Sequence, residues 1–287
     1  MRYLLILFLL CIGTAHAHIN IVTTSPMMHS LTSQIYGNPT KVKILSCAQT
    51  DCQNTLSTAD SQHLQNAQLI VWLGTEKGVE QWLKDHPKAN SFAVLTQTPD
   101  LELLPSEMDS QAPNPYVWLS PSNTLDILQV LTERLIELDP KNTKRFTKNL
   151  RQYSDRWEFF DSYKLPDSGT YPVMVSLQEG MEYMFSYLGL NNAQTLPMDE
   201  RRHDRMVSDI ALAAQIKQLN PVCVFVGPHF SKRSLANLNL PKSMKIVRVD
   251  VEGTEKDTGP YLYKNVMRPL FAHIYTCLDM KLPRHRR

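Results

Sequence analysis

The sequence lacks the short motifs that mark several enzyme classes. It has no G-x-S-x-G of serine hydrolases, no H-E-x-x-H of zinc peptidases and no glycine-rich phosphate loop, and only 10 of its 287 residues are glycine. An excess of positive charge is also missing, because 30 lysines and arginines face 28 aspartates and glutamates. Nucleic-acid-binding domains usually carry a basic surplus. We therefore predict a protein that is not an enzyme and does not bind nucleic acid.

Long apolar runs are absent after residue 17. Residues 1–17 read MRYLLILFLLCIGTAHA, with Arg2 before the apolar stretch and a small-x-small cleavage signal at its end. This pattern is typical of a secretory signal peptide and is too short for a membrane span. We expect cleavage after Ala17, which also removes Cys11. The sequence thus predicts an exported, soluble mature protein.

Cysteine is scarce, but the mature chain would keep an even number. The four remaining cysteines are Cys47, Cys52, Cys223 and Cys277. In an oxidising compartment an even count favours two disulfides, and four cysteines allow three connectivities between which sequence alone does not choose. Cys47 and Cys52 share one loop, where they could clip the loop, ligate a metal or cycle redox. Their spacing is not C-x-x-C, which argues against redox chemistry.

The first part of the chain alternates strand and helix patterns. Short β-branched or apolar runs predict strands at 19–24, 41–45, 69–74 and 91–96. Helical patterns lie between them at 25–37, 59–67 and 76–86. The first of these helices has Ser25 as a candidate N-cap, Pro26 at its first position and Gly37 as its stop. Such alternation predicts parallel βαβ units in a first α/β lobe over residues 18–120.

The middle of the chain is helical, and the last part returns to alternation. After a proline-rich, acidic loop at 98–116, leucines recur at helical spacing until Pro140, and a second helical stretch follows. We predict a connecting helical backbone over 121–164 and a second α/β lobe over 165–287. The predicted fold class is α/β, with two lobes of mostly parallel sheet flanked by helices and joined by a long rigid backbone helix. A cleft between two such lobes is a common place for a small ligand.

Four segments, in order and at matching spacing, resemble one protein family. They are SQHLQNAQLIVWLG at 61–74, NPYVWLSPSNTLDILQVLTERLIELDPKN at 114–142, EGMEYMFSYLGL at 179–190 and PVCVFVGPHFSKRSL at 221–235. The chain resembles the periplasmic zinc- and manganese-binding proteins of bacterial metal ABC importers, above all the zinc-binding component. The resemblance implies two lobes with little hinge motion, location in the periplasm, and capture of Zn²⁺ or Mn²⁺ in the interlobe cleft. It also implies an ABC permease in the inner membrane as the partner of a monomer.

The residues that bind metal in the family are replaced in this sequence. The family uses three histidines from three loops, a donor set that suits zinc. At the matching positions this chain has Cys52, Tyr116 and Gln178, and Asp51 stands where an acidic residue sometimes precedes the first histidine. A late family carboxylate has only an offset counterpart, Asp257. Thiolate is a good ligand when free, tyrosine must lose a proton, and glutamine offers a neutral carbonyl.

Two other histidines could contribute to a recast site. His29 and His229 both lie at predicted strand-to-helix turns, although a lone histidine at a turn is more often solvated or capping. The prediction is therefore a metal-binding protein with a degenerate site. The alternative is a scaffold or accessory periplasmic binding protein that no longer binds metal.

The resemblance also bears on the disulfides. Some zinc-binding members join the strand that corresponds to Cys223 to the terminal helix that carries Cys277. Closing a loop of about 50 residues contributes roughly 3–4 kcal/mol in the chain-entropy model. That bridge leaves Cys47 to pair with Cys52. If this second bond forms, Cys52 has no thiolate to offer a metal.

Overall fold

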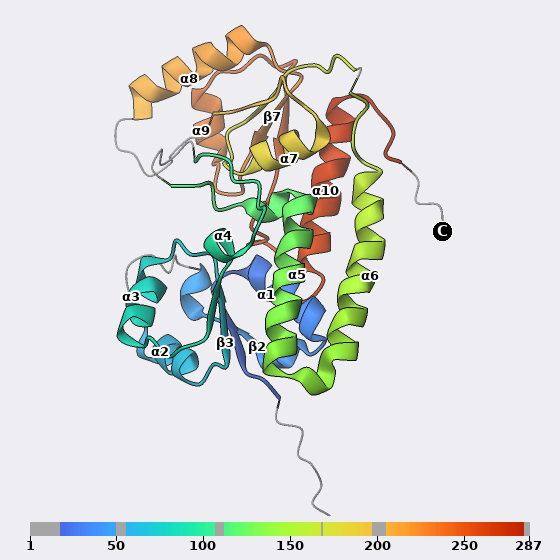
Figure 1. Ribbon diagram of the computed structural model, residues 1–287. Coiled ribbons are helices and arrows are strands. Elements are labelled where there is room, and N and C mark those ends of the chain that lie inside the picture. Colours follow the sequence, from blue (N-terminus) through green and yellow to red (C-terminus); the bar gives the residue numbers. More distant parts are fainter. Residues whose placement is uncertain (1–17, 50–55, 107–111, 168, 197–204, 284–287) are drawn as a thin grey trace, which may run out of the picture.

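The computed structural model describes residues 18–49, 56–106, 112–167, 169–196 and 205–283, without the side chains of residues 48–49, 156–159 and 205–208. The predicted signal peptide, Asp51 and Cys52 lie outside the described residues. Figure 1 shows two α/β lobes, one above the other, with long helices along one side.

The first lobe is built on a parallel sheet with the strand order β2-β1-β3-β4. Its strands are β1 (Ile21–Thr23), β2 (Val42–Ile44), β3 (Leu69–Trp72) and β4 (Ser91–Ala93). The register sets Ile21 opposite both Val42 and Leu69. Parallel neighbours need a crossover connection between them, which is what the predicted alternation of strands and helices supplies.

The second lobe repeats this arrangement, with the strand order β6-β5-β7-β8. Its strands are β5 (Met174–Ser176), β6 (Gln194–Thr195), β7 (Cys223–Val226) and β8 (Lys245–Arg248), all paired in parallel. The predicted fold class of two mostly parallel sheets flanked by helices is confirmed. In a parallel sheet all carboxyl ends meet at one edge, so the loops after these strands gather on one side of each lobe.

Helices flank the sheets and connect the lobes. The α-helices are α1 (Pro26–Tyr36), α2 (Thr58–Gln65), α3 (Lys77–Asp85), α4 (Val94–Gln97), α5 (Pro121–Leu138), α6 (Thr143–Asp161), α7 (Met181–Leu188), α8 (Arg205–Leu219), α9 (Lys232–Asn237) and α10 (Leu262–Cys277). Short 3₁₀ turns are η1 (Pro39–Lys41), η2 (Ser46–Gln49), η3 (Val117–Leu119) and η4 (Pro140–Asn142).

Helix α1 begins and ends as its sequence predicts. The Ser25 hydroxyl accepts the Met28 N–H at 3.1 Å, Pro26 opens the helix, and Gly37 ends it with a φ of +75°. Left-handed backbone of this kind favours glycine. Nearly all of α1 is buried, because it packs between the first sheet and helices α5, α6 and α10. The helix therefore anchors the first lobe to the helical side of the molecule (Figure 1).

The connecting segment is a helical hairpin. Helices α5 and α6 pack against each other and are joined by the η4 turn that begins at Pro140. The leucines predicted to share one face of α5 include Leu128, Leu131 and Leu135, which are all fully buried. The hairpin lies beside α1 and α10, runs along the first lobe and reaches the near side of the second lobe (Figure 1). One continuous core, with members from both lobes, runs through this region.

A disulfide ties the second sheet to the last helix. Cys223 of β7 is bonded to Cys277 of α10 with their Cα atoms 5.9 Å apart, as predicted. Nearby, the ring of Tyr163 stacks on Phe271 of α10 at 4.5 Å between centroids. The C-terminal helix is thus fixed to the lobe by a covalent bond and by aromatic packing.

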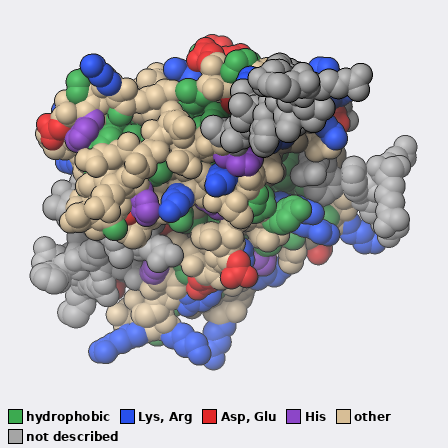
Figure 2. Space-filling model, turned by 90° about the horizontal axis from the view of Figure 1, so that it is seen from below, with side chains coloured by type: hydrophobic (Ala, Val, Ile, Leu, Met, Phe, Trp, Pro, Cys, Tyr) green, Lys and Arg blue, Asp and Glu red, His purple; other side chains and the backbone are tan. Residues whose placement is uncertain are grey.

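One strand is shorter than predicted. Residues 91–96 are predicted as a strand, but β4 ends at Ala93 and α4 begins at Val94. The Gln97 side chain accepts the Ala93 N–H at 3.1 Å, which satisfies this edge-strand donor from within the turn of helix. Among the described helices, none is long and apolar enough to cross a membrane. Viewed from the first-lobe end (Figure 2), lysines and arginines are spread over the face rather than gathered in one patch.

Candidate functional site between the lobes

Tyr116, the second predicted ligand position, lies at the junction of the two lobes. It precedes η3, and its N–H donates to the Asn114 side chain at 2.9 Å. Its ring meets Trp118 edge-on at 5.3 Å between centroids. Its hydroxyl donates to Glu252 Oε1, in the loop after β8, at 2.7 Å. A residue that leads into α5 is therefore joined directly to the second lobe.

The backbone at Gly180 allows Tyr116 to come this close. Gly180 has a φ of +98°, and a Cβ there would lie 2.6 Å from the Tyr116 Cβ and 2.9 Å from Leu119 Cδ1. Real Cβ atoms do not approach so closely, so both the backbone conformation and the contact require glycine. Tyr116 is packed onto the turn that starts α7.

The environment of Tyr116 keeps its phenol neutral. Burial, followed by the charge and hydrogen bond of Glu252, raises the pKa of Tyr116 well above its usual range. The carboxylates of Glu179 and Glu182 act in the same direction. Because a metal-binding tyrosine must be deprotonated, this surrounding disfavours Tyr116 as a phenolate ligand.

Gln178, the third predicted position, lies in the same turn. Its backbone N–H bonds to the Ser176 hydroxyl at 3.1 Å, and its Nε2 donates to the Glu179 carbonyl at 3.2 Å. Its Oε1 lies over Gly227, at the end of β7, in space that a Cβ on that glycine would fill. Gln178 therefore lies in the loop after β5 and packs against the loop after β7. Tyr116 packs on Gly180, two residues after Gln178, so the fold brings these two predicted positions to the same turn although they are far apart in the sequence.

Three carboxylates surround this turn, and sequence analysis did not single them out. Glu179 accepts the Ser106 hydroxyl, and Glu182 accepts the Asn114 side chain and the Gly180 N–H, the latter at 2.9 Å. Glu252 accepts Tyr116. Burial raises the pKa of Glu182, and the neighbouring Glu179 carboxylate adds to this effect.

A sequence signal for these carboxylates exists. Glu179 follows strand β5 by three residues, and Glu252 follows strand β8 by four (179 − 176 and 252 − 248). Acidic residues just beyond the carboxyl ends of parallel strands lie where ligands of such sheets bind. Asp250 is in a similar place, but its carboxylate accepts the Thr254 and Glu255 N–H groups, each at 3.0 Å, and closes its own loop.

The other predicted donors lie elsewhere. His29 is buried, and its Nε2 donates to the carbonyl of Val42 at 3.1 Å, at the amino end of β2. Burial lowers the pKa of His29 and outweighs this hydrogen bond. His229 is exposed, and Asp257 is exposed on the rim of a surface hollow of about 570 Å³ with Lys264 and Arg268. In the part of the chain that the structure describes, no three His, Cys, Asp or Glu side chains are grouped to hold a metal ion.

The loop of the first predicted position is described only up to Gln49. Cys47 is buried and disulfide-bonded. Nearby, Asp60 of α2 accepts the Ser46 N–H at 2.8 Å and the Ser46 hydroxyl at 2.6 Å. Burial opposes ionisation of Asp60, but hydrogen bonds from Ser46, Ser57 and Cys47 outweigh it and lower the pKa. The start of this loop is firmly anchored to α2.

Comparison with known proteins decides the family. The sequence profile described as zinc-uptake complex component A, periplasmic, matches residues 21–277. The chain belongs to this family. The match covers both sheets and all the helices described above.

Curated relatives in the family are distant and name several metals. The iron-binding protein YfeA of Yersinia pestis is 26% identical over 176 residues, which is 58% of this chain and 55% of YfeA. The high-affinity zinc uptake system protein ZnuA of Brucella suis is 22% identical, over 57% of this chain and 50% of that protein. The manganese ABC transporter substrate-binding lipoprotein PsaA of Streptococcus pneumoniae is 22% identical over 84% of each chain. The chain thus spans about half the length of the first two relatives.

Solved structures share the fold over nearly their whole length. The SBP FpvC from Pseudomonas aeruginosa, in complex with Mn²⁺, has a TM-score of 0.73 and 17% identity, covering 91% of this chain and 98% of FpvC. The periplasmic zinc-binding protein TroA from Treponema pallidum has a TM-score of 0.68 and 16% identity, covering 90% and 98%. At these identities the likeness concerns the two-lobed fold.

Proposed function

We propose that this protein is an exported solute-binding protein of a bacterial metal ABC importer. It captures a divalent metal ion between its lobes and delivers the ion, as a periplasmic monomer, to a permease of the inner membrane. The family match over residues 21–277 is the observation that carries this proposal. The relatives named for zinc, manganese and iron support a transition-metal cargo. The role is transport, with no catalytic step.

The metal site in this proposal is degenerate. Positions 52, 116 and 178, where the resemblance implies histidines, hold cysteine, tyrosine and glutamine. The described side of the interface offers oxygen atoms, from Gln178 and from the carboxylates of Glu179, Glu182 and Glu252, although the described residues do not group these carboxylates around one ion. Such donors suit Mn²⁺ better than Zn²⁺, which prefers imidazole and thiolate. We therefore expect weaker binding than a three-histidine site supports, with Mn²⁺ favoured relative to such a site.

Native mass spectrometry of the mature protein tests the proposal. The protein is stripped with a chelator, incubated with micromolar Zn²⁺, Mn²⁺ or Cu²⁺, and desalted. We expect one ion per chain, and reduced retention in Glu182→Gln. The matched control is Glu255→Gln, which alters an exposed carboxylate outside this interface. Absence of stoichiometric metal under all three conditions would refute metal capture and favour a scaffold or accessory role.

The disulfide of Cys47 bears on the first ligand position. We propose that its partner is Cys52, which clips the loop after β2 and withdraws the Cys52 thiolate from metal binding. The disulfide state of Cys47 supports this pairing. Peptide mapping without reduction checks it: a peptide pair containing residues 47 and 52 is expected. A free Cys52, or loss of metal in Cys52→Ser, would contradict it.

Export can be tested separately. N-terminal sequencing of the protein recovered from the periplasmic fraction is expected to begin at His18. Retention of residues 1–17 in the recovered protein would contradict a cleaved signal peptide.

A further inference from the structure

The segment that enters α5 is folded back on itself and pinned to the second lobe. The Asn114 N–H bonds to the Leu104 carbonyl at 2.8 Å, which draws the two ends of the loop together. Tyr183 of α7 then joins both ends: its hydroxyl accepts the Leu104 N–H and donates to the Asn114 carbonyl, each at 3.0 Å. The Asn114 side chain also donates to Glu182. Helix α7 therefore holds this segment by side-chain hydrogen bonds.

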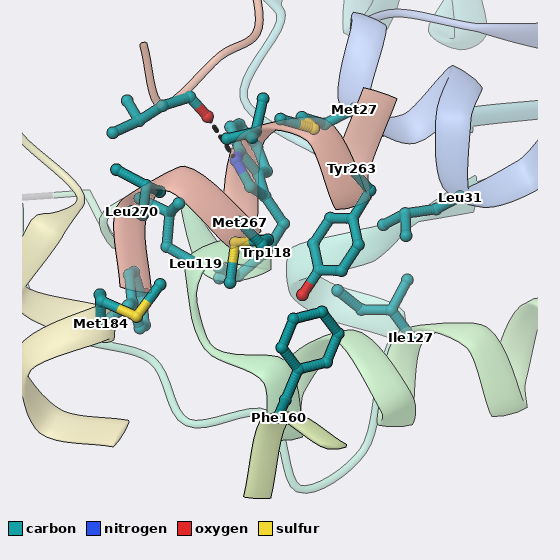
Figure 3. Packing of buried hydrophobic residues seen from close by; sticks show 14 of the residues in the cluster. Met27, Leu31, Trp118, Leu119, Ile127, Phe160, Met184, Tyr263, Met267 and Leu270 are labelled. Atoms are coloured by element: carbon teal, nitrogen blue, oxygen red, sulfur yellow. Dashed lines mark hydrogen bonds between the residues drawn. The ribbon is translucent and has the colours of Figure 1, made fainter. Parts of the chain in front are cut away.

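The next residues reach past α7 to the loop after β8. Tyr116 donates to Glu252 at 2.7 Å, and Trp118 Nε1 donates to the Val251 carbonyl at 3.0 Å, the bond drawn as a dashed line in Figure 3. Figure 3 also shows Trp118 among Met267 and Leu270 of α10. Both bonds join the segment before α5 to the loop after β8.

We propose that Tyr116 and Glu252 form an interlobe latch, a hydrogen bond that holds the entry to α5 against the second lobe without any cargo ion. The latch lies at the position where the family resemblance implies a metal ligand. At that position a phenol and a carboxylate of the protein bond directly to each other. The inference goes beyond the proposed function and does not rely on it.

Three features make this bond a strong connection. Its acceptor is a carboxylate, and hydrogen bonds to charged groups are stronger than neutral ones. Both side chains are half-buried, so water competes less for them than at an open surface. The Tyr116 ring is also fixed, because Gly180 and Trp118 support it from two sides. Opening the latch therefore exposes a carboxylate and a phenol that the closed state satisfies together.

Hydrogen exchange of the metal-free mature protein can report on both sides of the latch. On one side, the Leu119 amide bonds to the Tyr116 carbonyl at 3.0 Å and the Ser120 amide to the Val117 carbonyl at 3.2 Å. On the other, the Thr254 and Glu255 amides bond to Asp250. In Tyr116→Phe we expect exchange to rise about tenfold at both places, the change that corresponds to about 1.4 kcal/mol.

Tyr261→Phe is the matched control. It removes the same hydroxyl from a tyrosine that is 67% exposed, and it should leave both reporters unchanged. Glu252→Gln keeps a carbonyl oxygen that can accept the hydrogen bond from the Tyr116 hydroxyl. Its increase in exchange should therefore be smaller than that of Glu252→Ala. Glu252→Ala should match Tyr116→Phe at both reporters, since either change removes the same bond.

Several results would overturn the latch. One is unchanged exchange in Tyr116→Phe; another is a rise confined to residues 117–120, which would mean that the two segments are not coupled. Exchange in β1 and β3 serves as the folding check. If exchange in β1 and β3 also rises in Tyr116→Phe, the Glu252→Ala variant provides the test instead. Unchanged exchange at residues 117–120 in Glu252→Ala would then refute the latch. Failure of metal binding would leave these outcomes unaffected, because all samples contain chelator.

Discussion

The disulfide between Cys223 and Cys277 joins strand β7 of the second sheet to the C-terminal end of helix α10. The two cysteines are 54 positions apart in the sequence. Both cysteines are buried. Since β7 is flanked by β5 and β8, the bond fixes α10 to the middle of the sheet rather than to its edge. This helix also packs on α1 of the first lobe, so the disulfide stabilises a contact that involves both lobes.

Removal of this disulfide should destabilise the whole protein. For Cys223→Ala combined with Cys277→Ala we expect the free energy of unfolding to fall by about 3 kcal/mol, through the larger entropy of the unfolded chain. Urea denaturation followed by circular dichroism measures the change. A reducing agent should lower the stability of the wild type by more than that of the double variant. Equal effects on both would show that the bond contributes little.

The two glycines that bound α7 allow a controlled test of the Tyr116 contact. Gly189 has a φ of +76° with nothing within 4 Å of an added Cβ, whereas Gly180 has a φ of +98° and a Cβ there would meet Tyr116. We expect Gly189→Ala to cost about 1 kcal/mol from backbone strain alone. Gly180→Ala should cost about 1–3 kcal/mol more because the ring must move.

Chemical denaturation of both glycine variants gives the comparison. Gly180→Ala should also increase hydrogen exchange at residues 117–120, an effect that Gly189→Ala should not have. Equal stability of the two variants would indicate that Tyr116 is not packed on Gly180 in solution.

The hydrogen bond of Trp118 can be separated from its packing. Trp118→Phe leaves the Val251 carbonyl without its donor, and we expect a loss of about 1 kcal/mol beyond the loss of ring volume. Trp72→Phe is the matched control, since the Trp72 Nε1 is buried and has no hydrogen-bond partner among the described residues. Thermal or urea unfolding of the two variants measures the difference. A larger loss for Trp72→Phe would contradict this assignment.

His29 should make the stability of the protein fall in mild acid. Because burial lowers its pKa in the folded state, the unfolded chain binds a proton more readily, with a pKa of about 6.5. The contribution of His29 to stability is present above about pH 6.5 and is lost as pH falls from there toward the lower folded pKa. In His29→Gln this part of the pH dependence should disappear.

Urea midpoints at about pH 7.5 and about pH 5 check the sign of this effect. The matched variant for the amino-acid change itself is His229→Gln, which replaces an exposed histidine. His273 also has a pKa lowered by burial, so some acid sensitivity should remain in His29→Gln. A steeper loss of stability in His29→Gln than in the wild type would contradict the assignment.

Local sequence determined most of the architecture. The cap at Ser25, the proline at position 26 and the stop at Gly37 define α1 by hydrogen bonds and backbone angles within a few residues of one another. Runs such as residues 69–72 have no polar side chain apart from the indole of Trp72, which is typical of buried strands between covering helices. The motifs of the family could also be predicted, because their order and spacing lie in the chain. The pairing of Cys223 with Cys277 was predicted only through the resemblance to that family, because four cysteines by themselves allow three connectivities.

Only the tertiary structure decided which partners the residues of the candidate site meet. Tyr116 and Glu252 are 136 residues apart, and no local pattern indicates that a phenol before α5 would meet a carboxylate after β8. His29 has the residue type and turn position of a ligand, yet packing of α1 on β2 directs its ring to a backbone carbonyl of the sheet. The sequence determines the chemistry of each side chain. Which side chains become neighbours depends on how the two lobes pack, because contacts between distant segments result from the burial and hydrogen bonding of the whole fold.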